Sequence, residues 1–148
     1  MKFLLMAMVV VSGMTIPVQI AANKRLDQAL KSPVLPVAMT LLIGAAVAWL
    51  IVGLVPAARG EIGGARAAPW WAWVGGFLIV YAITTQILNA RQEGAGAVIA
   101  LVVAGQLAAA LVIDHFGWLG MKREAINWWK VLGAVLLVAG AWLMQVKK

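Results

Sequence analysis

Long apolar runs separated by short charged gaps are the feature that most restricts this fold. Five runs of about 19–24 residues extend over roughly 3–22, 34–57, 70–90, 95–113 and 128–146. At 1.5 Å per residue, about 20 helical residues cross the roughly 30 Å hydrocarbon layer of a bilayer. Backbone amides in lipid need internal partners, which a helix provides. The sequence therefore predicts an all-α integral membrane protein with five transmembrane helices in one domain, residues 1–148.

The composition agrees with a membrane protein and disfavours other classes. Charged residues make up 11% of the chain, whereas a soluble domain has about 25%. The net charge of +7 comes from Lys and Arg that flank the apolar runs, so we expect contact with lipid headgroups and not with nucleic acid. The chain has no cysteine and one His, and we find no nucleophile–base pair, metal set or phosphate loop. We therefore expect no catalytic residue, no metal, no cofactor and no enzymatic activity.

The first run resembles a secretory signal peptide because Lys2 precedes it. Its apolar residues continue beyond the length of a signal core, and no clear small-x-small cleavage site precedes a hydrophilic start. We therefore expect a membrane span, followed by a basic loop that contains Lys24, Arg25 and Lys31.

A polar stripe runs along this first span. On a helical wheel, Thr15, Gln19 and Asn23 fall within roughly 80° of one another, and Ser12 joins them. A helix that only anchors a protein in lipid does not need these residues. Pro17 lies on the other side and cannot donate to the carbonyl of Gly13, which predicts a kink. We predict that Thr15, Gln19 and Asn23 line a cavity and that Pro17 is its hinge.

Two further spans carry polar side chains. Tyr81, Thr85 and Asn89 repeat every fourth residue on the third span, and Gln106 lies near the middle of the fourth. We interpret these four as cavity-lining or substrate-binding residues, although hydrogen bonds between helices would also explain them.

Asp114 is the only acidic residue that we expect at the end of a span with an amide, Gln106, on its face. It is our candidate for coupling or for substrate binding. A solvated helix end, or an ion pair with Lys122 or Arg123, is the alternative. Small residues also repeat every fourth position at Gly96, Ala100, Ala104 and Ala108, which favours close helix packing.

Positive charges are divided almost equally between the two sides that five spans would define. Each side receives six: Lys2, Arg59, Arg66, Lys122, Arg123 and Lys130 against Lys24, Arg25, Lys31, Arg91, Lys147 and Lys148. Lys130 lies just inside the fifth run, and without it the count is five against six. A bias between the sides normally fixes orientation. Its absence indicates insertion in both orientations and an antiparallel homodimer, which would recreate the inverted repeat of many transporters. A single orientation set by weaker cues is the alternative.

Three segments resemble a known family. They are G-M-T-I-P-V-Q-I-A-A-N-K-R-L at 13–26, P-W-W-A-W-V-G-G-F at 69–77 and G-Q-L-A-A-A-L-V-I-D-H-F-G-W-L-G at 105–120. They are similar to the YdcZ-like family of small bacterial inner-membrane proteins, in the drug/metabolite transporter superfamily. The resemblance implies a multi-pass protein of the bacterial inner (plasma) membrane, a five-helix unit with relatives that occur as opposed pairs or fused ten-helix proteins, and a transporter or exporter. It implies no particular substrate.

We therefore expect a secondary transporter of small molecules that works by alternating access in a dual-topology dimer. A dual-topology channel for a small ion and a non-transporting membrane subunit are the alternatives. Small multidrug exporters of the same superfamily have a glutamate in their first helix, where this chain has Gln19, which cannot titrate. Proton exchange at that position is therefore disfavoured, and a neutral or zwitterionic metabolite fits at least as well as a cationic drug.

Overall fold

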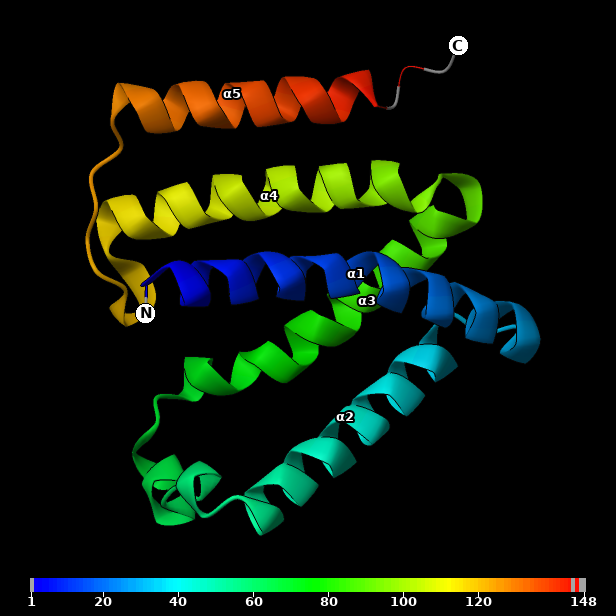
Figure 1. The fold of residues 1–148 in the computed structure, drawn as a ribbon, viewed down its shortest axis with the longest axis vertical. Helices are drawn as coiled ribbons and strands as arrows, with labels where there is room; N and C mark the ends of the chain where they lie inside the picture. Colours follow the sequence, from blue (N-terminus) through cyan, green and yellow to red (C-terminus); the bar gives the residue numbers. More distant parts are fainter. Residues whose placement is uncertain (1, 145, 147–148) are drawn as a thin grey trace. The chain divides into compact units, whose positions relative to one another are not determined.

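The computed structural model describes residues 2–144 and residue 146. These residues form five α-helices and contain no strand, which confirms the all-α prediction (Figure 1). The helices are α1 (Lys2–Leu30), α2 (Val34–Leu54), α3 (Gly75–Gln92), α4 (Ala95–Phe116) and α5 (Trp128–Leu143). Short 3-10 turns lie between α2 and α3, at Pro56–Ala58, Ile62–Ala67 and Trp70–Val74, and after α4, at Trp118–Gly120.

Four helical segments are long and apolar enough to cross a membrane, and they match four of the predicted spans. They are Lys2–Leu30, Val34–Leu54, Trp70–Gln92 and Ala95–Phe116. The fifth helix, α5, is apolar but has 16 residues, which corresponds to about 24 Å. A fifth span therefore stays a prediction, and residue 145 of the expected run lies outside the described residues.

The first helix is longer than the span predicted for it. Helix α1 continues to Leu30, so Lys24 and Arg25 are helical and the expected basic loop is reduced to Lys31–Pro33. Lys and Arg are good helix formers, so their charge ends the apolar run without ending the helix. The helix stops where Lys31 adopts a left-handed conformation, with φ of 52°, and where Pro33 disfavours a helical residue before it.

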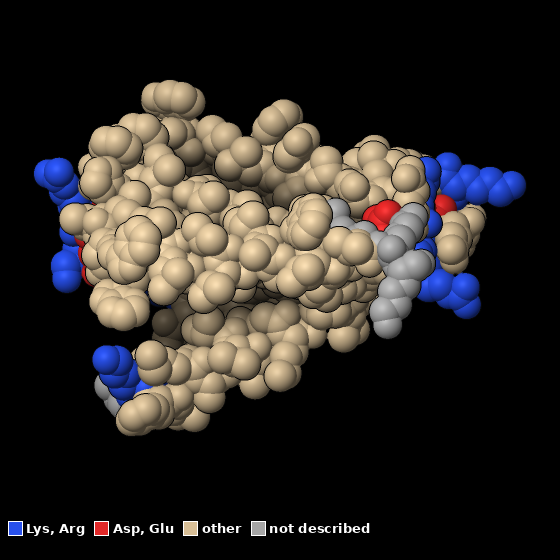
Figure 2. Space-filling view, turned by 90° about the horizontal axis from the view of Figure 1, so that it is seen from above, with Lys and Arg blue, Asp and Glu red and all other residues tan. Residues whose placement is uncertain are grey.

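The surface of the chain is mostly apolar. Figure 2 shows uncharged residues over most of the visible face, with Lys and Arg gathered in separate groups. Large side chains such as Phe3, Val18 and Leu42 are at least 70% exposed. Such a surface suits lipid and not water.

The chain divides into two compact units. One comprises Val18–Arg91, and the other comprises Met1–Pro17 with Gln92–Lys148. In the Val18–Arg91 unit, Val37 of α2 packs with Ile83 and Ile87 of α3. The part of α1 in this unit buries Ile20, Asn23 and Asp27, which are spaced three and four residues apart and so share one helix face.

In the other unit, α4 and α5 lie side by side and run in opposite directions (Figure 1). Helix α4 ends at Gly117, which has φ of 65° and can adopt this left-handed conformation because it lacks a Cβ. The chain then folds back, and the Glu124 amide donates to the Asp114 carbonyl at 2.8 Å. Asn127 starts α5, because its side chain accepts a hydrogen bond from the Lys130 amide at 2.9 Å.

Two of the four small residues that repeat along α4 border a groove between α4 and α5. Gly96 and Ala100 line this groove together with Gly140 and Ala141. A Cβ at Gly96 would come within 3.3 Å of the Met144 methyl carbon, so glycine permits the close approach there.

Candidate functional site

Asn23 is the one residue of the α1 stripe that the structure buries, with 2% of its surface exposed. Its carbonyl oxygen accepts a hydrogen bond from the Thr40 hydroxyl of α2 at 2.7 Å. Its amide nitrogen has no hydrogen-bond partner among the described residues. Asn23 therefore joins α1 to α2 and retains an amide NH2 group whose two donors are unused.

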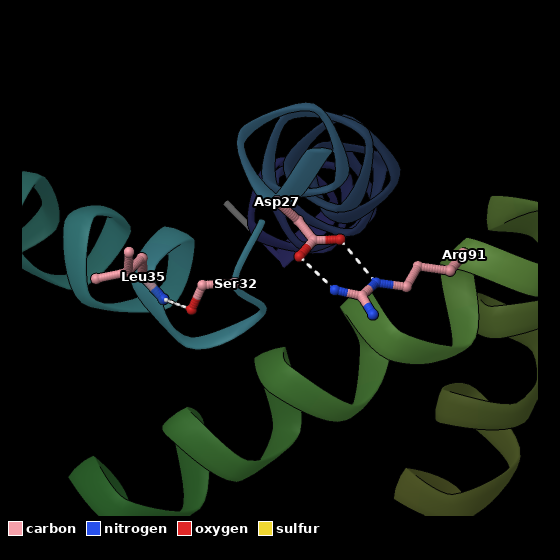
Figure 3. A network of polar contacts seen from close by, with 4 residues as sticks. All are labelled: Asp27, Ser32, Leu35 and Arg91. Carbon is pink, nitrogen blue, oxygen red and sulfur yellow. Dashed lines mark hydrogen bonds and ion pairs between the residues drawn. The ribbon is translucent and has the colours of Figure 1, made fainter. Parts of the chain in front are cut away.

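One turn further along α1, Asp27 forms an ion pair that the sequence analysis missed. Its carboxylate, 3% exposed, accepts hydrogen bonds from Nε and Nη2 of Arg91 at 2.8 and 2.7 Å. Figure 3 shows the two side chains meeting as a fork, with Ser32 and Leu35 at the α1–α2 connection. Two-point pairing of this kind fixes direction as well as distance. The pair joins the end of α1 to the end of α3.

The other stripe residues of α1 are exposed. The Thr15 hydroxyl donates to the Ser12 carbonyl at 2.7 Å, so it is satisfied by its own helix. The side chain of Gln19 is exposed and forms no hydrogen bond within the described part of the chain. Helix α1 is continuous through Pro17, and the boundary between the two compact units falls directly after this residue.

The polar stripe of α3 lies away from the buried face of that helix. Ile83, Ile87 and Ala90 are buried, whereas Tyr81 is 66% exposed. The Thr85 hydroxyl donates to carbonyls of the preceding turn at 2.9 Å, and Asn89 donates to the Thr85 carbonyl at 2.8 Å. The Thr85 hydroxyl and the Asn89 amide nitrogen are thus satisfied by α3 itself, and neither bonds to Asn23.

Gln106 and Asp114 occupy α4. Gln106 is exposed, and neither side chain forms a hydrogen bond or ion pair with the described residues. Neither of the two expected partners of Asp114, Lys122 and Arg123, pairs with it among the described residues. Arg123 donates to the His115 carbonyl at 3.2 Å, and the nearest ion pair joins Glu124 to Lys130 at 3.1 Å.

Asp114, Glu124 and Lys130 line one groove between α4 and α5. The hydrogen bond from Lys130, together with the positive charges of Lys130 and Lys122, lowers the pKa of Glu124. Glu124 is therefore ionised over a wider pH range than a free glutamate.

Asp114 is not the only acidic residue near the end of a span with an amide on its helix face, because Asp27 has Asn23 on its face. Asp27 follows Asn23 by four residues, as Asn23 follows Gln19. Continuing this spacing by one turn would have found it. Asp27 lies beyond residue 22, where the first span is expected to end, so the predicted stripe stops at Asn23.

Comparisons with known proteins confirm the resemblance to the YdcZ-like family. A family model described as "Putative inner membrane exporter, YdcZ" matches residues 4–143. The inner membrane protein YdcZ of Escherichia coli (strain K12) is 28% identical over 145 residues, which cover 95% of this chain and 94% of that protein. No solved structure matches the chain. The family is described as one of exporters and not of enzymes. The same description and the E. coli relative place it in the inner membrane. With nearly its whole length matched by that model, the chain belongs to the YdcZ family of inner membrane exporters.

Proposed function

We propose that this protein is a secondary transporter that exports small molecules by alternating access as an antiparallel homodimer. Family membership supports the exporter role. The antiparallel dimer is supported mainly by the side-chain amides of Gln19 and Gln106. Both amides are exposed and form no hydrogen bond within one copy of the described chain. An amide in contact with lipid is costly, so it needs water or a partner helix.

A second, inverted copy of the chain would supply the partner helix and would enclose the water that these amides need. Two copies create a shared cavity whose walls are the polar stripes and whose hinge is Pro17. The cavity-lining residues in this proposal are Thr15, Gln19, Asn23, Tyr81, Thr85, Asn89 and Gln106, and Asp114 is the coupling candidate. Exchange of conformations between the two copies then opens the cavity to alternate sides.

The equal division of positive charge supports two orientations, and it depends on α5 crossing the membrane. At about 24 Å, α5 is shorter than the hydrocarbon layer. Local thinning of the bilayer and anchoring by Trp128 and Trp129 accommodate such a difference at modest cost. We therefore place all five helices in one membrane domain.

Orientation can be tested with reporters on the C-terminus. We expect signal from both sides of the membrane. Lysines added to one set of loops should lock the orientation and inactivate the protein, and co-expression of the oppositely locked copy should restore transport. Full activity from a single locked form contradicts the antiparallel pair.

Flux measurements in liposomes distinguish a transporter from a channel. We expect saturable uptake with counterflow, because alternating access binds substrate on each side in turn. Ohmic single-channel currents would instead identify a pore.

A further inference from the structure

The groove that contains Asp114 has the size and lining of a ligand site. Its volume is about 390 Å³, and small-molecule pockets span about 300–1,000 Å³. It lies between α4 and α5, near the segment that connects them. Three of its lining residues are charged and the rest are apolar or small: Asp114, Glu124 and Lys130, with Leu107, Ala110, Leu111, Gly133, Ala134 and Leu137.

The three charges leave one carboxylate uncompensated. Glu124 and Lys130 neutralise each other at 3.1 Å, whereas the Asp114 side chain has no partner within the described residues. The lining therefore has a net charge of −1 in an otherwise apolar groove. A carboxylate in such surroundings gains more from a cation than one in bulk water.

The backbone holds both carboxylates at this groove. The Glu124 amide donates to the Asp114 carbonyl at 2.8 Å, which brings the connecting segment back against the end of α4. The cap that Asn127 provides fixes the first turn of α5 and with it Lys130. The charges are thus positioned without a ligand, which lowers the ordering cost of binding.

We propose that this groove binds a ligand with one ammonium group and an apolar body. The ammonium pairs with the carboxylate of Asp114, and the apolar body lies along Leu107, Leu111 and Leu137. An anion is repelled by Asp114, and a second positive charge finds Glu124 already occupied by Lys130. The assignment names a ligand class for the exporter function proposed above and rests on that function.

Binding to the full-length protein in phosphatidylcholine nanodiscs tests the proposal. The probe is 4-phenylbutylammonium, and its neutral match is 4-phenylbutanol, both titrated by calorimetry at neutral pH. We expect the ammonium to bind at least about tenfold more tightly, as for a charge-assisted hydrogen bond. Asp114→Asn should remove this preference and leave the affinity for the alcohol unchanged. Glu61→Gln, which removes an acid that is not part of this groove, is the matched control and should change neither affinity.

A second variant is chosen to increase the affinity, because a gain in affinity cannot be explained by misfolding. Lys130→Met keeps an apolar chain of similar length but leaves two carboxylates and a net charge of −2. We expect it to bind 4-phenylbutylammonium several-fold more tightly than the wild type. The proposal is overturned if the ammonium and the alcohol bind equally, if Asp114→Asn retains the preference, or if Lys130→Met shows no gain.

These measurements need no gradient, so they separate the ligand site from transport. If the predicted affinities are found but liposomes show no flux of any ammonium ligand, the site stands and the exporter function fails. If flux is measured but the affinities do not follow Asp114 and Lys130, the ligand site fails alone.

Discussion

The carboxylate of Asp27 on α1 and the guanidinium of Arg91 on α3 pair through two hydrogen bonds, although 64 residues separate them in the sequence. Asp27 is 3% exposed, whereas the Arg91 side chain is 45% exposed. The two partners therefore do not respond equally to loss of the other.

Removing Arg91 should destabilise the protein more than removing both partners. Arg91→Ala leaves the Asp27 carboxylate buried and unpaired, whereas Asp27→Ala/Arg91→Ala removes the charge as well. We expect the lowest melting temperature for Arg91→Ala and partial recovery in the double variant, measured in detergent by fluorescence-detected gel filtration. Arg25→Ala, on the exposed side of α1, is the control. Additive losses would show that the two residues are not coupled.

The bond between Thr40 and Asn23 should stabilise the packing of α1 against α2. Thr40→Val keeps the shape of the side chain but leaves both polar groups of the buried Asn23 amide unsatisfied. We expect a loss of about 1–3 kcal/mol in the free energy of unfolding. Thr85→Val should cost much less, because the Thr85 hydroxyl bonds only to its own helix. Equal losses from the two variants would contradict this difference.

Gly117 should resist substitution more than other glycines of the same helix pair. Alanine there must adopt the left-handed conformation, and its Cβ would lie 3.2 Å from the Cβ of Arg123. We expect Gly117→Ala to cost about 1–2 kcal/mol in the free energy of unfolding. Gly105→Ala is the matched control, because a Cβ at Gly105 meets no atom within 4 Å. Chemical denaturation of both variants would test the ranking.

The ion pair of Glu124 with Lys130 should make the stability of the folded protein depend on pH. The pKa of Glu124 is lower in the folded protein than in the unfolded chain. Its stabilising effect is therefore present above the unfolded pKa and is lost as the pH falls through the folded pKa. We expect the difference in melting temperature between wild type and Glu124→Gln to shrink as the pH falls from neutral into the acid range. A difference that stays constant with pH would remove the ion pair as its cause.

Gln19→Ala and Asp114→Asn should each abolish transport while expression and dimerisation remain normal. Gln19 would lose its contact with substrate or water in the shared cavity, and Asp114 would lose its charge. Flux in liposomes and cross-linking of the dimer are the two measurements. Near-normal transport by both variants would disprove the site assignment.

The fold was predicted from the length of the apolar runs, and three of these runs match helical segments of the structure within a few residues at both ends. Run length failed at the end of α1, because Lys24 and Arg25 are as compatible with a helix as with a loop. The apolar pattern of the sequence predicts which residues lie in the lipid, whereas a helix can continue beyond the lipid.

Periodicity also predicted which polar residues share a helix face, but not what the face meets. Asn23 proved to be buried against α2, whereas Tyr81, Thr85 and Asn89 lie off the buried face of α3. The pairing of Asp27 with Arg91 depends on how α1 and α3 pack, and no local spacing encodes that contact.

The length of α1 links the Asp27–Arg91 pair to the lipid composition of the membrane. With 29 residues, α1 measures about 43 Å, so its last turns extend beyond the roughly 30 Å of hydrocarbon. If α1 crosses the bilayer from its N-terminal end, Asp27 would lie at the depth of the headgroups, where the 45% exposed side chain of Arg91 would be within reach of phosphate. Anionic lipids would then compete with Asp27 for this guanidinium. Their abundance in the host membrane would therefore set how firmly α1 is tied to α3.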